Sequence, residues 1–137
     1  MHGETDLQKL LASMQPHLHE EVFVFATTKE PYDVAALKPL LQFQEAEGTT
    51  LIVTRAAAQA HGLAHTFACR MITLNVHSSL EAVGFMAKIS AQLAAASMGV
   101  NPVAGYFHDH LFVPENRAEQ ALVVLRQLAE GRNMSSN

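Results

Sequence analysis

The residues of this sequence best suited to chemistry are His108, Asp109 and His110, which follow one another directly. Imidazole is the commonest protein ligand for zinc, and His77 would supply a third nitrogen. The competing interpretation is that His108 and Asp109 form a turn and that His110 merely begins a strand. Because the sequence does not place a third and a fourth ligand, we expect no metal site, and a site on His108 and His110 remains the alternative.

The sequence contains no motif that would indicate catalysis without a metal. The sequence has no nucleophile motif, no glycine loop for phosphate and no suggestively spaced pair of carboxylates. Cys69 is the only cysteine, so it cannot form an internal disulfide, and in an apolar run it is better explained as a strand residue than as a nucleophile. We expect a non-catalytic protein without a cofactor. If it were an enzyme, it would be a metal-assisted hydrolase on the His-Asp-His segment.

The composition excludes several classes of protein. Of the 137 residues, 49% are hydrophobic and 16% are charged, which is enough apolar material for a core. The nine lysines and arginines are scattered and the formal net charge is -4, so we expect no nucleic-acid partner. The N-terminus lacks the features of a signal peptide, and no apolar run reaches the ~18 residues that span a bilayer. We therefore expect a cytoplasmic protein with no membrane partner.

Hydrophobic periodicity predicts the same order of elements twice. Residues 21–62 and 67–130 each give a strand, a helix, two strands joined by a hairpin, and a second helix. This βαββα order is typical of split βαβ sandwiches, so the expected fold class is α+β, ferredoxin-like. The expected division is residues 1–66, an N-terminal helix with a first, abbreviated unit, and residues 67–137, the second unit.

The first half begins with a helix for which Thr5 would be the N-cap. The β-branched and aromatic run that follows predicts a strand covered on both faces. The elements expected after that helix are a strand at 22–26, a short helix at 34–37, a hairpin turning at Glu47-Gly48, and an Ala-rich helix from a Thr54 cap to Gly62.

The second half has longer elements. Its first strand alternates apolar and polar residues, so one face should be buried and the other polar. The elements expected here are a strand at 67–77, a helix from a Ser78 cap to Gly99, a strand at 100–107, a turn at His108-Asp109, a strand at 111–113, and a helix from an Asn116 cap to Gly131. Neither half has a closing strand, so the sheet edges should need a partner copy, and we expect a homodimer.

Several segments of the sequence resemble the ACT domain. Residues 72–84 (ITLNVHSSLEAVG) look like its first strand, ligand loop and first helix, and residues 100–114 (VNPVAGYFHDHLFVP) are similar to the following hairpin. With residues 3–7 (GETDL) and 43–53 (FQEAEGTTLIV), they resemble a family of small bacterial tandem-ACT proteins of undefined function. The regulatory portion of aspartate kinases and the cytosolic arginine sensors of animals share the tandem arrangement.

The resemblance implies a binding site for an amino acid between two ACT units. In those relatives the ligand contacts the loop after the first strand and a neighbouring second strand. The residues that the resemblance assigns to this role are His77, Ser78, Ser79, Leu80, Val83, Gly84, Asn101, Pro102 and Val103, or the matching edge at Ala26, Thr27 and Thr28. Asp109 would take the amino group.

Physical chemistry is compatible with this assignment. A helix N-terminus carries free backbone N–H groups, which suit the carboxylate of an amino acid. Gly84, in the first turn, would allow a ligand to approach closely. The structural alternatives are that Ser78 only caps the helix and that Gly84 only relieves crowding against the sheet.

The leading hypothesis is a regulatory module that binds an amino acid or a related small metabolite. No catalytic domain precedes the tandem, so the module should report to a separate, unknown protein. The alternative is a pure interaction and oligomerisation module in which the pocket is empty.

Overall fold

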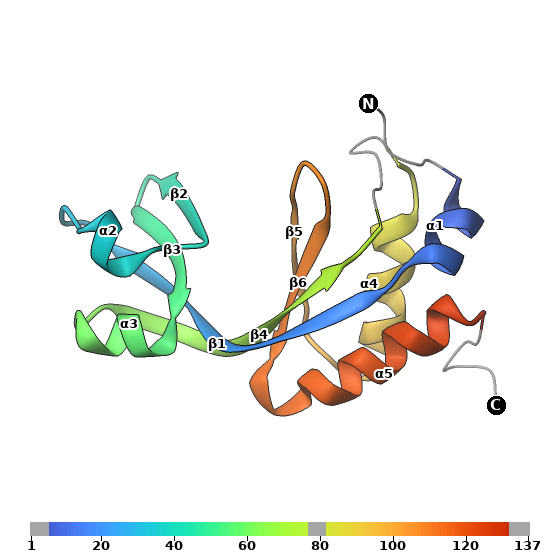
Figure 1. The fold of residues 1–137 in the computed structure, drawn as a ribbon. Coiled ribbons are helices and arrows are strands. Elements are labelled where there is room, and N and C mark those ends of the chain that lie inside the picture. The colour runs from blue at the N-terminus through green and yellow to red at the C-terminus, as the bar shows by residue number, and fades with distance from the viewer. Residues whose placement is uncertain (1–5, 77–81, 132–137) are drawn as a thin grey trace. The chain divides into compact units, whose positions relative to one another are not determined.

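The computed structural model describes residues 6–76 and 82–131, which form two compact units (Figure 1). The smaller unit is Glu21–Cys69, and the larger unit is Met1–Glu20 with Arg70–Asn137. The elements in chain order are α1 (Leu7–Ser13), β1 (Pro16–Thr28), α2 (Val34–Leu37), β2 (Leu41–Glu45), β3 (Gly48–Thr54), α3 (Arg55–Ala60), β4 (Ala64–Leu74), α4 (Phe85–Ala95), β5 (Asn101–Ala104), β6 (Asp109–Pro114), a 3-10 turn (Glu115–Arg117) and α5 (Ala118–Ala129).

The strand order confirms the predicted duplication. Strands are hydrogen-bonded in the order β2-β3-β1-β4 within the smaller unit and β1-β4-β6-β5 within the larger unit, and β1 and β4 contribute residues to both. In each βαββα copy the third strand lies between the first and the second, because β3 separates β1 from β2 and β6 separates β4 from β5. This is the ferredoxin-like arrangement that the sequence predicts.

Local signals in the smaller unit act nearly as predicted. The β2–β3 hairpin turns at residues 46–47, one residue before the predicted Glu47-Gly48, and Glu45 lies opposite Gly48, the first residue of β3. Thr54 caps α3, because its hydroxyl accepts a hydrogen bond from the backbone N–H of Ala57 at 3.1 Å, and Gly62 follows the helix with a φ of 64°. The core of this unit lies between the helices and one face of the strands and consists of Val24, Ala26, Leu37, Leu51, Val53 and Ala58.

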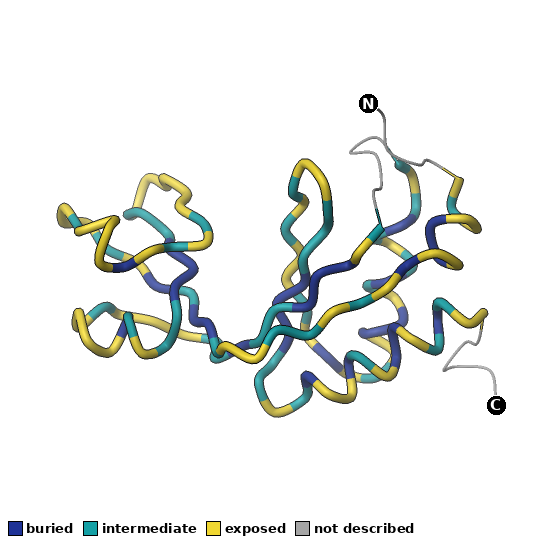
Figure 2. Tube along the Cα trace, viewed as in Figure 1, coloured by how far each residue is buried: buried dark blue, intermediate teal, exposed yellow. Residues whose placement is uncertain are grey.

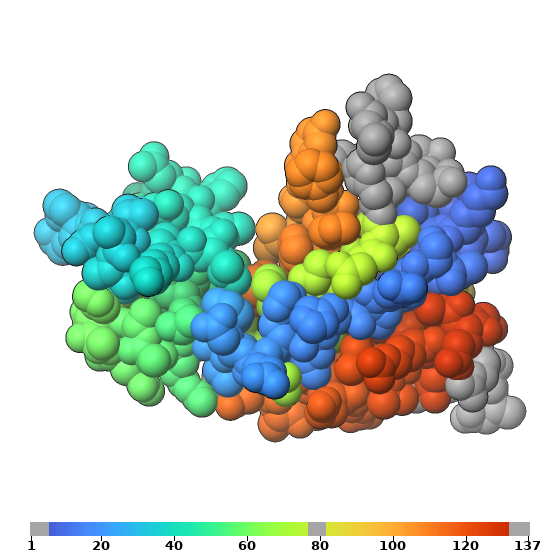
Figure 3. Space-filling view, viewed as in Figure 1, coloured from blue at the N-terminus to red at the C-terminus, as the bar shows by residue number. Residues whose placement is uncertain are grey.

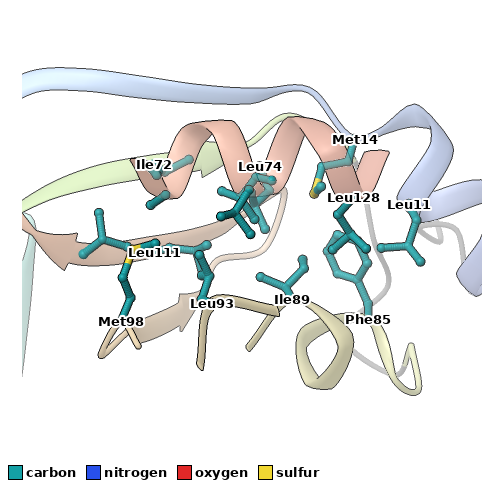
Figure 4. Close-up of a cluster of buried hydrophobic side chains, with 14 of the residues drawn as sticks. Leu11, Met14, Ile72, Leu74, Phe85, Ile89, Leu93, Met98, Leu111 and Leu128 are labelled. Atoms are coloured by element: carbon teal, nitrogen blue, oxygen red, sulfur yellow. The ribbon is translucent and has the colours of Figure 1, made fainter. Parts of the chain in front are cut away.

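The larger unit holds the larger core. Side chains from α1, α4 and α5 pack against those of β4 and β6, and the buried stretches are dark in Figure 2. Each fully buried leucine or isoleucine contributes about 2 kcal/mol through the apolar surface that it removes from water. Figure 4 labels ten of the residues, which point toward one another: Leu11, Met14, Ile72, Leu74, Phe85, Ile89, Leu93, Met98, Leu111 and Leu128.

The N-terminal helix is present, but its cap differs from the prediction. The Asp6 carboxylate accepts a hydrogen bond from the Lys9 backbone N–H at 3.1 Å, whereas Thr5 lies outside the described residues. Strand β1 is also much longer than the predicted strand at 22–26, because it begins at Pro16. Strand β4 begins and ends three residues before the predicted strand, at Ala64 and Leu74.

Helix α4 has a later start and an earlier end than the sequence predicts. It begins at Phe85 with Gly84 as its N-cap, while the predicted cap at Ser78 lies outside the described residues. The left-handed residue after the helix is Ser97, with a φ of 61°, and not Gly99. The Met98 N–H donates to the Leu93 carbonyl at 3.0 Å, and Met98 is buried in the core. This hydrophobic contact fixes the C-terminus and places a serine where glycine is usual.

The second hairpin turns earlier than predicted. Strand β5 stops at Ala104 and β6 starts at Asp109, so the turn comprises residues 105–108 and not His108-Asp109. The Gly105 N–H donates to the His108 carbonyl at 2.9 Å, and a Cβ at Gly105 would lie only 2.8 Å from that oxygen. The turn therefore requires glycine at this position.

The last helix confirms the prediction at one end only. It ends before Gly131, which has a φ of 83°, but Asn116 is not its cap, because residues 115–117 form a 3-10 turn. Arg117 anchors this turn through its side chain, which donates to the Ala96 carbonyl at 2.8 Å and to Gln120 at 2.8 Å.

The compact units do not follow the predicted division at residue 66. The N-terminal helix and the first residues of β1 pack with the second βαββα copy, because Leu10, Leu11 and Met14 belong to the core around β4 and α4. The division into residues 1–66 and 67–137 stays a prediction about how the chain is duplicated. Across the described residues, none of the helices has the length and apolarity needed to cross a bilayer.

Candidate functional site

Among the described residues, no side chain caps the N-terminus of α4. Gly84 occupies the N-cap with a φ of 88°, a conformation that other residues adopt only with strain, and it has no side chain to accept a hydrogen bond from the first turn. The first N–H groups of any α-helix lack intrahelical acceptors and carry the positive end of the helix dipole. This end of α4 is therefore suited to an anionic group.

The equivalent helix of the first copy has the opposite property. Helix α2 has only four residues, and the Asp33 carboxylate at its N-cap accepts a hydrogen bond from the Ala36 N–H at 3.1 Å. A negative charge and an occupied donor make that end unsuitable for a carboxylate ligand. The two copies have thus diverged at the position where the resemblance predicts a ligand.

The predicted ligand residues around α4 are only partly described. His77, Ser78, Ser79 and Leu80 lie outside the described residues. Val83 is 84% exposed. Gly84 was predicted in the first turn of the helix, but it is the N-cap. A Cβ at Gly84 would lie 3.6 Å from the Leu7 side chain of α1. The structure thus gives Gly84 a conformational role, and its contact with a ligand stays a prediction.

The other predicted ligand residues lie on the second hairpin. Asn101, Pro102 and Val103 belong to β5, the outermost strand of the larger unit, where a proline is tolerated because one edge is unpaired. Val103 pairs with His110 across the hairpin, and Asp109 pairs with Ala104. The structure therefore places the predicted residues in two groups, one at the start of α4 and one on β5 and β6.

The predicted matching edge lies at the end of β1, in the smaller unit. Ala26 is buried in the core of this unit, and the Thr28 hydroxyl accepts a hydrogen bond from the Glu30 N–H at 3.1 Å. Thr27 pairs with Thr50 of β3. Ala26 and Thr27 also line a cavity of about 400 Å³, together with Phe25, Thr50 and residues 64–66.

A polar cluster that the sequence did not reveal lies on the face of β4 opposite the core. The hydroxyl of Thr73 is 2.8 Å from Nε2 of His19 on β1 and 3.0 Å from Nδ1 of His110 on β6. Thr73 belongs to the face of this strand that was predicted to be polar, and it is only 8% exposed. The ring of His17 meets that of His19 edge to face at 4.6 Å. Polar and apolar residues alternate along residues 16–20, which could have indicated a strand with its histidines on one face. The sequence could not show the cluster itself, because His19 and His110 are 54 and 37 residues away from Thr73.

The histidines of the second hairpin are not arranged as metal ligands in the described part of the chain. The rings of His108 and His110 are 6.5 Å apart, and Nδ1 of His110 is engaged by Thr73. Burial, followed by the neighbouring His108, lowers the pKa of His110, which Asp109 partly offsets. Within residues 6–76 and 82–131, no group of three His, Cys, Asp or Glu side chains is placed to hold a metal ion.

Cys69 is a buried strand residue. Its thiol donates a hydrogen bond to the Phe23 carbonyl at 3.3 Å, and burial raises its pKa to about 12. The thiolate is the nucleophilic form of cysteine, so this side chain is unreactive at neutral pH.

The tip of the second hairpin presents two aromatic side chains. Tyr106 and Phe107 are 67% and 63% exposed, and their rings meet edge to face at 4.9 Å. Figure 3 shows the hairpin, in orange, standing out on this face of the larger unit. Both residues were predicted in the strand at 100–107, and no signal in the sequence marked them as a surface feature.

Family models for the ACT domain match both copies. One matches residues 2–70 and the other residues 66–127, so that together they cover nearly all of the described chain. The two matches confirm the tandem arrangement and the resemblance that residues 72–84 and 100–114 carry.

Solved structures give the same result. A Vibrio cholerae protein of unknown function, described as a possible transport protein, is 41% identical, with a TM-score of 0.82 over 90% of this chain and 95% of that one. An Agrobacterium tumefaciens protein is 12% identical, with a TM-score of 0.71 over 85% and 89% of the two chains. The ligand-free regulatory subunit of aspartate kinase from Thermus thermophilus is 12% identical, with a TM-score of 0.66 over 86% and 97%. Among curated proteins, none matches this chain.

Proposed function

This chain belongs to the ACT-domain family, and we propose on that premise that it is a non-catalytic regulatory module that binds an amino acid at the start of α4. ACT domains are typically small-molecule-binding regulatory modules, as in the regulatory subunits of aspartate kinases. The proposed ligand carries its carboxylate to the N–H groups of the first turn of α4. The proposed readout is a change in binding to a separate protein.

One observation supports this proposal above the others. No side chain in residues 6–76 and 82–131 caps the α4 N-terminus, whereas the equivalent α2 N-terminus is capped by the Asp33 carboxylate. A carboxylate ligand can replace the missing cap, and an interaction of this type contributes about 1 kcal/mol from capping and a similar amount from the helix dipole. The remaining affinity would come from contacts to the ligand's side chain and amino group, for which Asp109 stays the predicted acceptor.

The experiment that tests the proposal is an amino-acid screen of the full chain by thermal shift, followed by calorimetry with any hit. A ligand at a hundred times its Kd raises the free energy of unfolding by about 2.7 kcal/mol. We predict that Val83→Asp weakens binding of the hit about tenfold, because Val83 is exposed beside the helix start and the new carboxylate would repel the ligand's.

Two matched controls accompany this variant. Val83→Asn has the same shape without the charge and should bind nearly as well as the parent chain. Val123→Asp places the same charge on an exposed position of α5 and should leave binding unchanged. Equal binding by Val83→Asp and Val83→Asn would contradict the placement of the carboxylate at α4.

A second candidate function, a protein interaction module, is favoured by the exposed pair of Tyr106 and Phe107 at the hairpin tip. Large exposed aromatic residues are typical of interfaces between proteins. This alternative predicts that no amino acid shifts the melting temperature and that Tyr106→Ser with Phe107→Ser abolishes self-association or partner binding.

We further propose that the chain is a homodimer. The outer edges of β2 and β5 support this proposal, because each lies at the end of its strand order and an unpaired edge can accept a strand from another copy. Sedimentation equilibrium at several concentrations tests it, and a monomer throughout would overturn it.

A further inference from the structure

The cavity of the smaller unit has a donor and acceptor pattern that selects for one kind of ligand. It measures about 400 Å³ and is bounded by Phe25–Thr27 of β1, Thr50 of β3 and residues 64–66 at the start of β4. It is lined by residues of the smaller unit, whereas the start of α4 belongs to the larger unit. Its polar side chains are those of Thr27, Thr50, His65 and Thr66.

His65 offers an acceptor to this cavity. Its Nδ1 lies 2.8 Å from the carbonyl oxygen of Leu63. A carbonyl oxygen only accepts hydrogen bonds, so Nδ1 must carry the proton. In the neutral imidazole the other nitrogen, Nε2, is then a lone-pair acceptor.

Thr50 offers a second acceptor. Its hydroxyl donates a hydrogen bond to the Glu45 carboxylate on the neighbouring strand β2. A hydroxyl has one proton, so Oγ1 of Thr50 retains only lone pairs for a ligand. The Glu45 carboxylate also brings a negative charge to this side of the cavity. The hydroxyls of Thr27 and Thr66 are able to serve either role.

The remaining walls are apolar. Phe25 lines the cavity, and its ring is held edge to face by Phe67 at 5.8 Å. Ala26 and Ala64 complete the apolar surface. Among the described residues that line the cavity, none is a lysine or an arginine.

We propose that this cavity is a second binding site, specific for a small organic amine that has an aromatic or aliphatic body and no carboxylate. The ammonium group donates to Nε2 of His65 and Oγ1 of Thr50 near the Glu45 carboxylate, and the body packs on Phe25. An aromatic face beside an ammonium group adds a cation–π contribution. A free amino acid is disfavoured, because its carboxylate would lie near that of Glu45 without a partner.

The experiment is an NMR titration of the full chain with phenethylamine, phenylalanine and 3-phenylpropionate, which differ only in the charged groups on one aromatic body. We predict saturable binding of phenethylamine in the millimolar to micromolar range, with amide shifts confined to the residues around the cavity. Phenylalanine should bind there at least about tenfold more weakly, and 3-phenylpropionate should not bind there. Equal shifts from all three compounds, or none from phenethylamine, would overturn the proposal.

Two variants and one control test the assigned acceptors. Thr50→Val and His65→Leu each remove one acceptor and should weaken phenethylamine about tenfold. His61→Leu makes the same change at an exposed histidine that does not line the cavity and should have no effect. His65 is exposed, so its variant should fold even if Thr50→Val disturbs the hairpin. Unchanged affinity in His65→Leu would overturn the assignment.

The proposals for this site and for the amino-acid site can be rejected independently of each other. Val83→Asp should weaken the amino acid and leave phenethylamine unaffected. Absence of amine binding in a chain that still binds an amino acid would reject only the second site.

Discussion

Thr73→Val removes the hydroxyl that connects two imidazole rings and keeps the size and β-branching of the side chain. Thr73 is almost fully buried, and its hydroxyl is 2.8 Å from His19 and 3.0 Å from His110. The variant therefore loses two hydrogen bonds between strands β1, β4 and β6. It also leaves two partly buried ring nitrogens without that partner.

The size of the effect follows from this geometry. A hydrogen bond between neutral groups contributes about 1 kcal/mol net to stability, and an unsatisfied buried nitrogen adds a further penalty. Loss of both hydrogen bonds should therefore lower the free energy of unfolding by about 2–3 kcal/mol. For a chain of this length, 1 kcal/mol changes the melting temperature by roughly 3–4 °C. We therefore predict that the variant melts roughly 6–12 °C below the parent chain.

Chemical denaturation at pH 7.5, followed by circular dichroism, measures this loss as a free energy. Thr66→Val is the matched control, because it makes the same substitution at an exposed position of β4 and should change stability by less than about 0.5 kcal/mol. If Thr73→Val were as stable as Thr66→Val, the hydrogen bonds to His19 and His110 would not contribute to the fold.

Two further predictions concern groups whose pKa is shifted. Burial lowers the pKa of His110 below its ordinary value of 6.5, so the folded chain binds fewer protons than the unfolded chain; its contribution to stability is present above pH 6.5 and is lost as the pH falls below that value. The stability of His110→Gln, measured from pH 7.5 to 5, should fall less steeply than that of the parent, and parallel profiles would refute this. For Cys69, with its pKa raised to about 12, a thiol reagent should label the chain only after unfolding. Rapid labelling of the native chain at mildly alkaline pH would show that the thiol is accessible.

Much of the architecture could be predicted from local sequence signals. The βαββα order appears twice because hydrophobic periodicity reports which face of each element is buried. Thr54, Gly62 and Gly131 also act as predicted, and the turn expected at Glu47-Gly48 is displaced by only one residue, because turns and caps depend on residues within four positions of one another.

The errors occur where tertiary packing overrides a local signal. Gly99 was expected to end α4, but Met98 packs into the core against the helix and so places Ser97 in the left-handed conformation. The turn of the second hairpin lies at 105–108 because Gly105 alone permits its close approach to His108.

The site could be predicted only in part. The resemblance predicts a strand, loop and helix for it, but it does not reveal that Gly84 is the N-cap or that Asp33 caps the equivalent helix. The cluster of His19, Thr73 and His110 depends on contacts between strands far apart in sequence, which periodicity does not report. Most of the predicted ligand loop lies outside the described residues, so its role stays a prediction.

The most direct test of the central proposal is a map of backbone amide shifts with the amino acid that the screen identifies. The proposal predicts that the largest shifts fall on the first-turn amides of α4, at Phe85, Met86 and Ala87, because these N–H groups receive the ligand's carboxylate. These shifts should need about tenfold more ligand to reach half-saturation in Val83→Asp and should titrate in Val83→Asn as in the parent chain. Saturable binding that shifts amides elsewhere and leaves the start of α4 unchanged would contradict the proposal.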